Sequence, residues 1–241
     1  MTSPLIDLSV VVPLHNEAGN VARLCGALST SLDRNPCVRA YQLVLVDDGS
    51  TDNTLELLRR HRTERTTIIP LARRRGQSGA LAAGLEATTY ETVARLDGDL
   101  QTTPDDLAPL LTLLARGYDC VHGIRLQRQD GVVRRLSSRV ANAVRRMVLG
   151  DTFKDISCPL SVFHKHCLAT VPRFDALHRY LPYLIQAQGY TVAEFPVRHF
   201  PRVAEKTKYG ISNRLWVGVR SLVVVRRWSR TVHAGLGRRA A

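Results

Sequence analysis

The chain has 241 residues, 44% hydrophobic and 23% charged, which is the composition of a globular protein and excludes fibrous and disordered classes. Lysine and arginine outnumber aspartate and glutamate by 34 to 21, and the net charge of +13 favours anionic partners such as phosphorylated substrates, nucleic acid or an acidic membrane surface. The five cysteines show no C-x-x-C spacing, which argues against a disulfide framework or a structural zinc site and fits a reducing compartment.

Neither end of the chain carries an evident membrane signal. The first residues, M-T-S-P-L-I-D, have no basic region followed by a long apolar stretch, so we expect no signal peptide. No window reaches the roughly 18 to 20 apolar residues that a spanning helix needs.

The first half of the chain alternates short apolar runs with helical patterns. Runs typical of buried strands lie at 8–13, 41–46, 66–71 and from Thr92 to the acidic residues near 97, and helical patterns follow at about 18–32, 52–60, up to 87, and 104–116. This alternation predicts a parallel sheet covered by helices on both faces, an α/β architecture.

Polar clusters follow each of these strands. P-L-H-N-E follows the first, D-D-G-S-T-D the second and R-R-R-G-Q-S-G the third. Ligands of open α/β sheets bind outside the carboxyl ends of the strands, so the sequence predicts a single nucleotide-type site there. Asp47 and Asp48 could accept hydrogen bonds from a base or ribose, while an Asx turn and a helix cap are the alternative for this turn.

The fourth strand ends in two carboxylates, Asp97 and Asp99, separated by Gly98. Residues i and i+2 of an extended segment point the same way, and the glycine relaxes the backbone so that the two carboxylates can converge. Hard oxygen ligands suit Mg²⁺ or Mn²⁺, and such ions usually also bind substrate phosphates. A solvated loop with two acids is the alternative, because D-x-D is common by chance.

The second half is more basic. We expect strands at 119–123, 155–163 and 190–199 and a helix at 179–188. An amphipathic helix within 124–150 carries arginines, including Arg139, on its polar face, and a solvated basic face is the alternative. A basic loop from His199 to Gly210 precedes an apolar stretch, 212–228, that ends in arginines.

Several function classes lack their usual signatures. The chain has no G-x-G-x-x-G after its first strand and no G-x-x-x-x-G-K-[ST], which argues against dinucleotide redox chemistry and P-loop hydrolysis. Only 6% of residues are aromatic, and no RNA-binding signature is present, so we do not expect a nucleic-acid partner.

The motifs V-V-V-P-L-H-N-E, L-V-L-V-D-D-G-S-T-D-N-T, G-Q-S-G-A-L-A-A-G-L and L-D-G-D-L-Q-T-T-P resemble, in order and spacing, those of family 2 glycosyltransferases. D-I-S-C-P-L-S-V-F and K-T-K-Y-G-I-S-N-R resemble the dolichol-phosphate mannosyltransferase branch, which includes bacterial polyprenyl-phosphate glycosyltransferases. The resemblance covers about residues 9–228 and implies an A-type glycosyltransferase fold, a Rossmann-like, mostly parallel sheet with helices on both faces.

The resemblance also implies roles for individual residues. Asp97, Asp99 and Gln101 would hold a divalent metal, Mg²⁺ or Mn²⁺. Arg125 and Arg139 would meet an acceptor phosphate, and Asp155 could act as a base or orient Arg139 or a lysine. The nucleotide sugar would be bound by Pro13, Asn16, Glu17, Asp47, Asp48, Gly76, Asp97, Lys206 and Lys208.

The implied reaction is an inverting transfer of a sugar, mannose or a related hexose, from a GDP- or UDP-linked donor to a polyprenyl phosphate. The alternative is a soluble family member with a non-lipid acceptor. We expect a catalytic domain over 1–210 and a C-terminal helix and tail over 211–241, which either contact an anionic membrane surface or pack on the domain. The expected location is cytoplasmic, at the inner face of the membrane.

Overall fold

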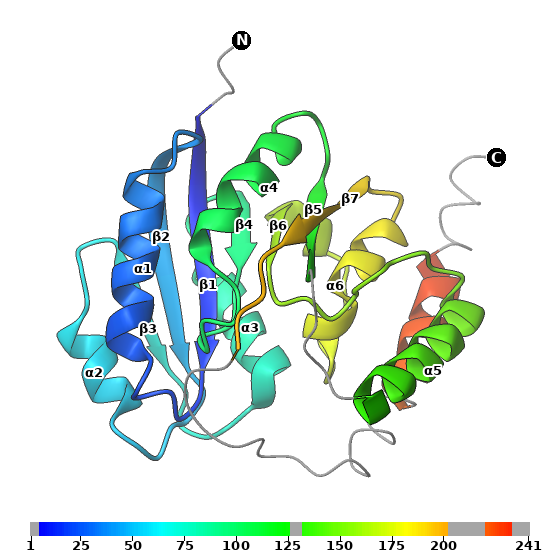
Figure 1. Ribbon diagram of the computed structural model, residues 1–241, viewed down its shortest axis with the longest axis horizontal. Coiled ribbons are helices and arrows are strands. Elements are labelled where there is room, and N and C mark those ends of the chain that lie inside the picture. The colour runs from blue at the N-terminus through cyan, green and yellow to red at the C-terminus, as the bar shows by residue number, and fades with distance from the viewer. Residues whose placement is uncertain (1–4, 126–131, 202–219, 233–241) are drawn as a thin grey trace.

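The computed structural model describes residues 5–125, 132–201 and 220–232, with the backbone alone described for 132–140. Seven strands form one sheet in the order β3-β2-β1-β4-β6-β5-β7 (Figure 1). The strands are β1 Ile6–Leu14, β2 Val38–Asp47, β3 Thr66–Pro70, β4 Thr92–Arg95, β5 Cys120–Arg125, β6 Ser161–His164 and β7 Val192–Val197.

Six of these seven strands run in one direction. β1 pairs in parallel with β2 and β4, β2 with β3, and β5 with β7, whereas β6 lies antiparallel between β4 and β5. The expected mostly parallel sheet is therefore confirmed, and β6 is the exception. The carboxyl ends of the six parallel strands meet at one edge of the sheet, called the carboxyl edge below, and their amino ends meet at the opposite, amino edge.

Helices cover both faces of the sheet, as expected. α1 and α4 pack on one face and α3 and α6 on the other (Figure 1). The α-helices are α1 Val21–Asp33, α2 Thr54–Arg60, α3 Gly76–Glu86, α4 Leu107–Leu114, α5 Val132–Leu149 and α6 Leu177–Gln186, and two 3₁₀ helices are η1 Pro104–Asp106 and η2 Lys165–Leu168.

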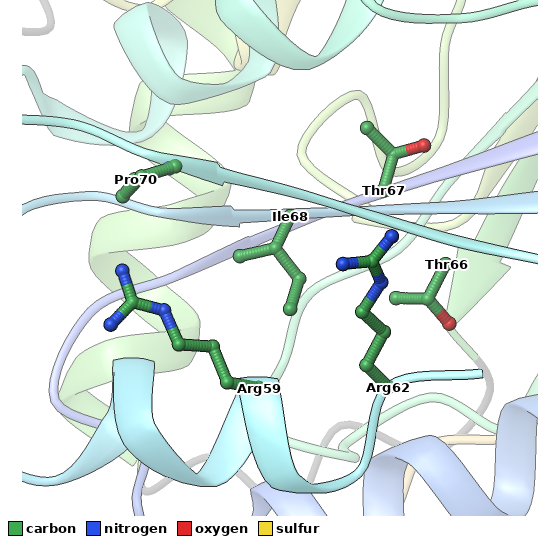
Figure 2. A pocket seen from close by; sticks show the side chains of 6 residues that line it. All are labelled: Arg59, Arg62, Thr66, Thr67, Ile68 and Pro70. Atoms are coloured by element: carbon green, nitrogen blue, oxygen red, sulfur yellow. The ribbon is translucent and has the colours of Figure 1, made fainter. Parts of the chain in front are cut away.

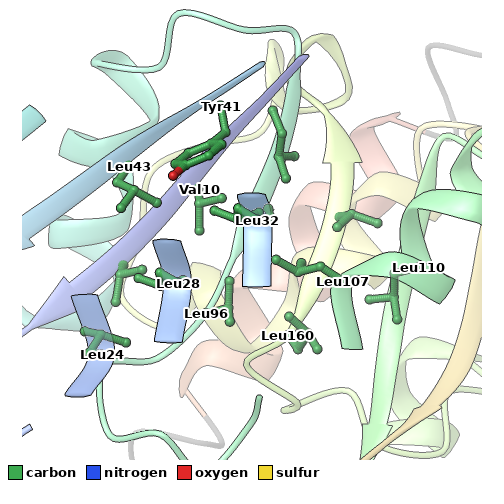
Figure 3. Packing of buried hydrophobic residues seen from close by; sticks show 14 of the residues in the cluster. Val10, Leu24, Leu28, Leu32, Tyr41, Leu43, Leu96, Leu107, Leu110 and Leu160 are labelled. Carbon is green, nitrogen blue, oxygen red and sulfur yellow. The ribbon is translucent and has the colours of Figure 1, made fainter. Parts of the chain in front are cut away.

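The apolar run of β1 is continuous because both of its faces are buried. Val10 packs with Leu28 of α1 and Leu107 of α4 in one cluster (Figure 3). Val11 points the other way and packs with Leu81 of α3, since successive side chains of a strand alternate between faces. The two clusters fix β1 at the centre of the fold and hold the loop that follows it in a defined place.

The expected strand over 155–163 is wrong in its first part. β6 begins only at Ser161, and the residues before it form a turn in which the Cys158 N–H donates to the Asp155 carbonyl at 3.1 Å. The same carbonyl accepts a bond from His122, so this segment is held by contacts more than 30 residues away. The expected strand at 190–199 and helix at 179–188 are present as the shorter β7 and as α6, which begins at Leu177.

Residues 220–232 form a helix that packs on the domain. Leu222 and Val225 are buried in a third cluster with Leu149 of α5 and Leu184 of α6, but Val223 and Val224 are 47% and 38% exposed. The helix therefore packs on the domain through Leu222 and Val225, while Val223 and Val224 stay outside the core. Within the described part of the chain, every helix is too short or too polar to cross a membrane.

Candidate active site at the carboxyl edge

The loops after β1 and β2 are joined by hydrogen bonds from backbone to side chain. The Asn16 N–H donates to Ser50 Oγ at 3.0 Å, and the Thr51 N–H donates to Asn16 Oδ1 at 2.7 Å. The Glu17 N–H donates to Thr54 Oγ1 at 2.8 Å. Asn16 has a φ of 54°, a left-handed conformation that asparagine adopts more readily than most residues. Pro13, Asn16 and Glu17, three of the expected nucleotide-binding residues, are brought together here and are partly exposed.

Asp47, the last residue of β2, and Asp48, the next residue, have different surroundings, although both are buried. Asp48 Oδ1 accepts the N–H of Arg75 at 2.6 Å, directly before Gly76, which begins α3 with a φ of 75°. Asp47 Oδ2 accepts the Ser50 N–H at 3.4 Å, and Asp47 Oδ1 is buried with no hydrogen-bond partner among the described residues. Buried acceptors are normally satisfied, so Asp47 Oδ1 is an exception among the described residues.

Asp97 and Asp99 lie just beyond β4, beside the end of β1. A Cβ on Gly98 would lie only 3.0 Å from Leu14 Cγ, so the glycine lets the acidic turn approach β1 closely. Gln77 Nε2 donates to Asp97 Oδ1 at 2.5 Å, and the Gln101 N–H donates to Asp99 Oδ1 at 3.2 Å. The acidic turn therefore lies beside the end of β1 and the start of α3, and the convergence of the two carboxylates on one ion stays a prediction.

The electrostatics of Asp97 suit a cation. The pKa of the Asp97 carboxyl is raised to about 6: burial and the charge of Asp99 raise it, and together they outweigh Arg95, Gln77 and Arg125, which lower it. The charge of Asp99 disfavours the ionisation of Asp97, and a divalent ion would relieve that repulsion. The donor set of carboxylate and amide oxygens at Asp97, Asp99 and Gln101 therefore fits Mg²⁺ or Mn²⁺.

Arg95 is a residue that the sequence reading missed. Its side chain is buried, with 2% of the residue exposed, and its guanidinium donates to the carbonyls of His178 and, at 3.3 Å, Cys158. As the last residue of β4, two positions before Asp97, it places a positive charge close enough to lower the Asp97 pKa. A single arginine inside the apolar run T-V-A-R-L is the signal that could have identified it.

Arg125 and Asp155 form a bidentate ion pair at the same edge. Arg125 Nε donates to Asp155 Oδ2 at 2.7 Å and a terminal guanidinium nitrogen donates to Oδ1 at 2.8 Å. Arg125 also lowers the pKa of Asp97, so the pair belongs to the same electrostatic site. Asp155, expected to act as a base or to orient Arg139, is thus engaged by Arg125. Arg139 lies in α5 where only the backbone is described.

The chain after β7 returns to the acidic turn. The Phe200 N–H donates to the Gln101 carbonyl at 2.9 Å, and Gln101 Nε2 donates to the Phe200 carbonyl at 3.5 Å. The basic segment follows almost directly after this contact. Lys206 and Lys208, expected to bind the nucleotide sugar, and the expected domain boundary after residue 210 lie outside the described residues.

A shallow hollow elsewhere does not belong to this site. It lies between α2 and the edge strand β3, and Figure 2 shows Arg59 and Arg62 extending from the α2 side toward the strand. Its lining contains none of the expected site residues. The lining residues are Arg59, Arg62, Thr66, Thr67, Ile68 and Pro70.

Known proteins resemble this chain over most of its length. The model of the family described as glycosyl transferase family 2 matches residues 9–181. An undecaprenyl-phosphate 4-deoxy-4-formamido-L-arabinose transferase of Edwardsiella ictaluri (strain 93-146) is 31% identical over 207 residues. That match covers 85% of this chain and 63% of the relative, so the chain spans less than two thirds of the curated protein.

Two solved structures share the fold at about one fifth sequence identity. A glucosyl-3-phosphoglycerate synthase from Mycobacterium tuberculosis, in complex with Mn²⁺, UDP and glucosyl-3-phosphoglycerate, aligns with a TM-score of 0.69 and 20% identity, over 93% of this chain and 80% of that one. A mannosyltransferase from Pyrobaculum calidifontis, in complex with GDP-Man and Mn²⁺, aligns with a TM-score of 0.63 and 20% identity, over 99% and 76%. The expected A-type glycosyltransferase fold is therefore confirmed.

Proposed function

Because the chain belongs to glycosyl transferase family 2, we propose that it transfers a sugar from a nucleotide sugar to a polyprenyl phosphate. The observation that carries this proposal is the Asp97 and Asp99 pair, which lies against the end of β1 and carries a carboxyl whose pKa is raised to about 6. A pair of carboxylates of this kind, beside the hydrogen-bonded loops that follow β1 and β2, suits a divalent metal and the diphosphate that the metal would bind.

The donor would bind across the loops of β1, β2 and α3. The nucleoside would contact the part-exposed residues after β1 and the aspartates at the end of β2, and the diphosphate would reach the acidic turn. Asp97, Asp99 and Gln101 would hold Mg²⁺ or Mn²⁺, which when bound neutralises the charge that the leaving diphosphate gains. The remaining donor contacts that we propose are Pro13, Asn16, Glu17, Asp47, Asp48, Gly76, Lys206 and Lys208.

The proposed acceptor is supported by similarity to a curated relative and by the positive charge of Arg125. The curated relative is named for undecaprenyl phosphate, and Arg125 presents a guanidinium at the same edge as Asp97. An oxygen of the acceptor phosphate would attack the anomeric carbon while the bond from that carbon to the diphosphate breaks, which inverts the configuration. The phosphate is already ionised near neutral pH, so Asp155 need not remove a proton and instead holds Arg125 in place. Arg139 would help Arg125 to bind the acceptor.

The sugar that we propose differs from the mannose or related hexose expected from the sequence. The curated relative is named for 4-deoxy-4-formamido-L-arabinose, a substituted pentose, rather than for mannose. We therefore propose a substituted pentose as the first donor to test, with mannose and other hexoses as comparisons.

The lipid acceptor requires contact with a membrane surface, and exposed apolar side chains support one. Val144 and Met147 of α5 are 42% and 80% exposed, and Val223 and Val224 are exposed on the helix at 220–232, which shares a hydrophobic cluster with α5. Exposed arginines of the same helix could reach anionic head groups. We propose that these two helices rest on the inner face of the membrane.

A partition assay tests the proposal. Labelled UDP- and GDP-sugars, including the formamido-arabinose donor, would be incubated with the protein, Mn²⁺ and undecaprenyl phosphate, and label would be counted in the organic phase. Asp97→Asn and Asp99→Asn should abolish transfer, whereas Asp7→Asn, at the opposite end of β1, should not. Label transferred only to a water-soluble acceptor would support the non-lipid alternative, and full activity of Asp97→Asn would refute the proposed site.

A further inference from the structure

A second group of potential metal ligands lies at the amino edge of the sheet, opposite the candidate active site. Asp119 directly precedes β5, and His166 and Cys167 belong to η2, which follows β6. One ligand atom from each of these three side chains lies within 4.8 Å of the other two. The proposed transfer reaction uses none of them.

The reversed direction of β6 brings these residues together. β6 runs antiparallel to its neighbours, so its last residues meet the first residues of β4 and β5, with His164 opposite Thr92. The His164 N–H donates to the Asp119 carbonyl at 3.1 Å, and Cys167 Sγ lies 3.9 Å from the same carbonyl. The backbone therefore fixes η2 against the start of β5 in the absence of any ion.

The carboxylate and the imidazole are held in place by their neighbours. Asp119 Oδ2 accepts the Thr191 N–H at 2.8 Å and the Thr191 hydroxyl at 2.7 Å, which orients the carboxylate. His166 Nδ1 lies 2.7 Å from Glu91 Oε1. Histidines that ligate metals usually bond their second ring nitrogen to a carboxylate, and Glu91 is in position to do this for His166.

We propose that Asp119, His166 and Cys167 bind a Zn²⁺-class transition metal ion. A thiolate, an imidazole and a carboxylate form a ligand set that Zn²⁺ accepts and that Mg²⁺ and Ca²⁺ do not. Cys167 is fully buried and His166 is exposed, so solvent water could complete the coordination from the open side. Bound metal would fasten η2 to β5 and so stabilise the amino edge, away from the transfer reaction.

His166 and Cys167 are adjacent in the sequence, but Asp119 lies far from them and no C-x-x-C or H-x-x-x-H pair is present, so the spacing gives no zinc motif. A thiol binds a metal ion only as the thiolate, so the ion must displace the proton of Cys167. Affinity should therefore fall as the pH is lowered.

Cobalt is a probe that separates this site from the acidic turn, because only a thiolate ligand gives a sulfur-to-cobalt charge-transfer absorption. We would add Co²⁺ to the full chain after metal removal with a chelator. The expected result is one Co²⁺ bound with thiolate absorption, which Zn²⁺ abolishes and excess Mg²⁺ does not. Asp97→Asn should leave this absorption intact, since that residue lies at the other edge.

Substitutions then test the assigned ligands. Cys167→Ser should remove the absorption, and Cys25→Ser, which changes a buried cysteine on α1, should keep it. Because a buried substitution can impair folding, His166→Gln at the exposed ligand and Glu91→Gln at its partner provide a second measurement. Each should weaken Co²⁺ binding by about tenfold or more. Binding without thiolate absorption, or absorption unchanged in both Cys167→Ser and His166→Gln, would overturn the proposal.

Discussion

Replacing Asp97 by asparagine should make the metal-free protein more stable while it removes a proposed metal ligand. Burial, together with the charge of Asp99, raises the pKa of the Asp97 carboxyl from 3.8 to about 6. A carboxyl of this kind favours the folded state fully below its unfolded pKa, and that contribution is lost as the pH rises through the folded value. Asparagine is neutral at every pH and can still accept the bond from Gln77.

The size of the effect follows from the two pKa values. A difference of about two pH units, at roughly 1.4 kcal/mol per unit, corresponds to at most about 3 kcal/mol. Asp97 is partly exposed, so solvent screens part of the electrostatic effect on its carboxylate. We therefore expect Asp97→Asn to gain about 1 to 2 kcal/mol in stability above neutral pH. For a chain of this length, such a gain raises the melting temperature by roughly 2 to 8 °C.

Thermal unfolding in EDTA, from about pH 4 to about pH 8, measures this directly. The gain in stability of Asp97→Asn over the parent should be near zero at the acidic end of this range and should reach its full size at the alkaline end. Asp52→Asn is a control of opposite sign: burial raises the Asp52 pKa, but bonds from Thr54 and Ala18 outweigh it and lower the pKa. A variant Asp97→Asn no more stable than the parent at about pH 8 would refute the reasoning.

Three further predictions concern packing, the acceptor and the membrane. Gly84→Ala should cost about 1 to 3 kcal/mol in urea unfolding, because its Cβ would lie 2.4 Å from a valine methyl of β1, whereas Gly19→Ala, with nothing within 4 Å, should cost less; equal losses would contradict this. Arg125→Lys should lower transfer to lipid phosphate by about tenfold without weakening nucleotide-dependent thermal stabilisation, because lysine cannot make the bidentate contact with Asp155 that holds the cation in place. Loss of nucleotide binding before loss of transfer would count against the acceptor role. Changing Val223 and Val224 to serine together should reduce sedimentation with anionic vesicles, and sedimentation equal to that of the parent would exclude this contact surface.

Much of the donor half of the site could be predicted from local sequence. The buried strands β1, β2 and β4 are short apolar runs that end in polar residues, and parallel packing brings those ends to one edge. The pairing of the acidic turn with β1 followed from the same rule, with Gly98 making the close approach possible. These features depend on neighbours in sequence and on one general property of parallel sheets.

The parts that could not be predicted depend on distant contacts. Residues 155–160 look extended in sequence, but the side chain of Asp155 binds Arg125 and its carbonyl binds His122, which impose a turn. A short apolar run also reads the same in either direction, so the antiparallel course of β6 was not visible. The buried role of Arg95 and the cluster at Asp119 both follow from tertiary pairing and left only weak local signals.

The antiparallel strand β6 also has a consequence for how the molecule folds and opens. Within the sheet, the four strands β3-β2-β1-β4 connect to β5 and β7 only through β6, which pairs over four residues with β4 and three with β5. Contacts so distant in sequence form late, because a long loop must close before they are made. We expect the hydrogen-deuterium exchange rate of the β6 amides to report how often β6 separates from its two neighbouring strands. Such an opening would separate Arg125 from Asp97 and leave the pairing of β1 with β2 intact.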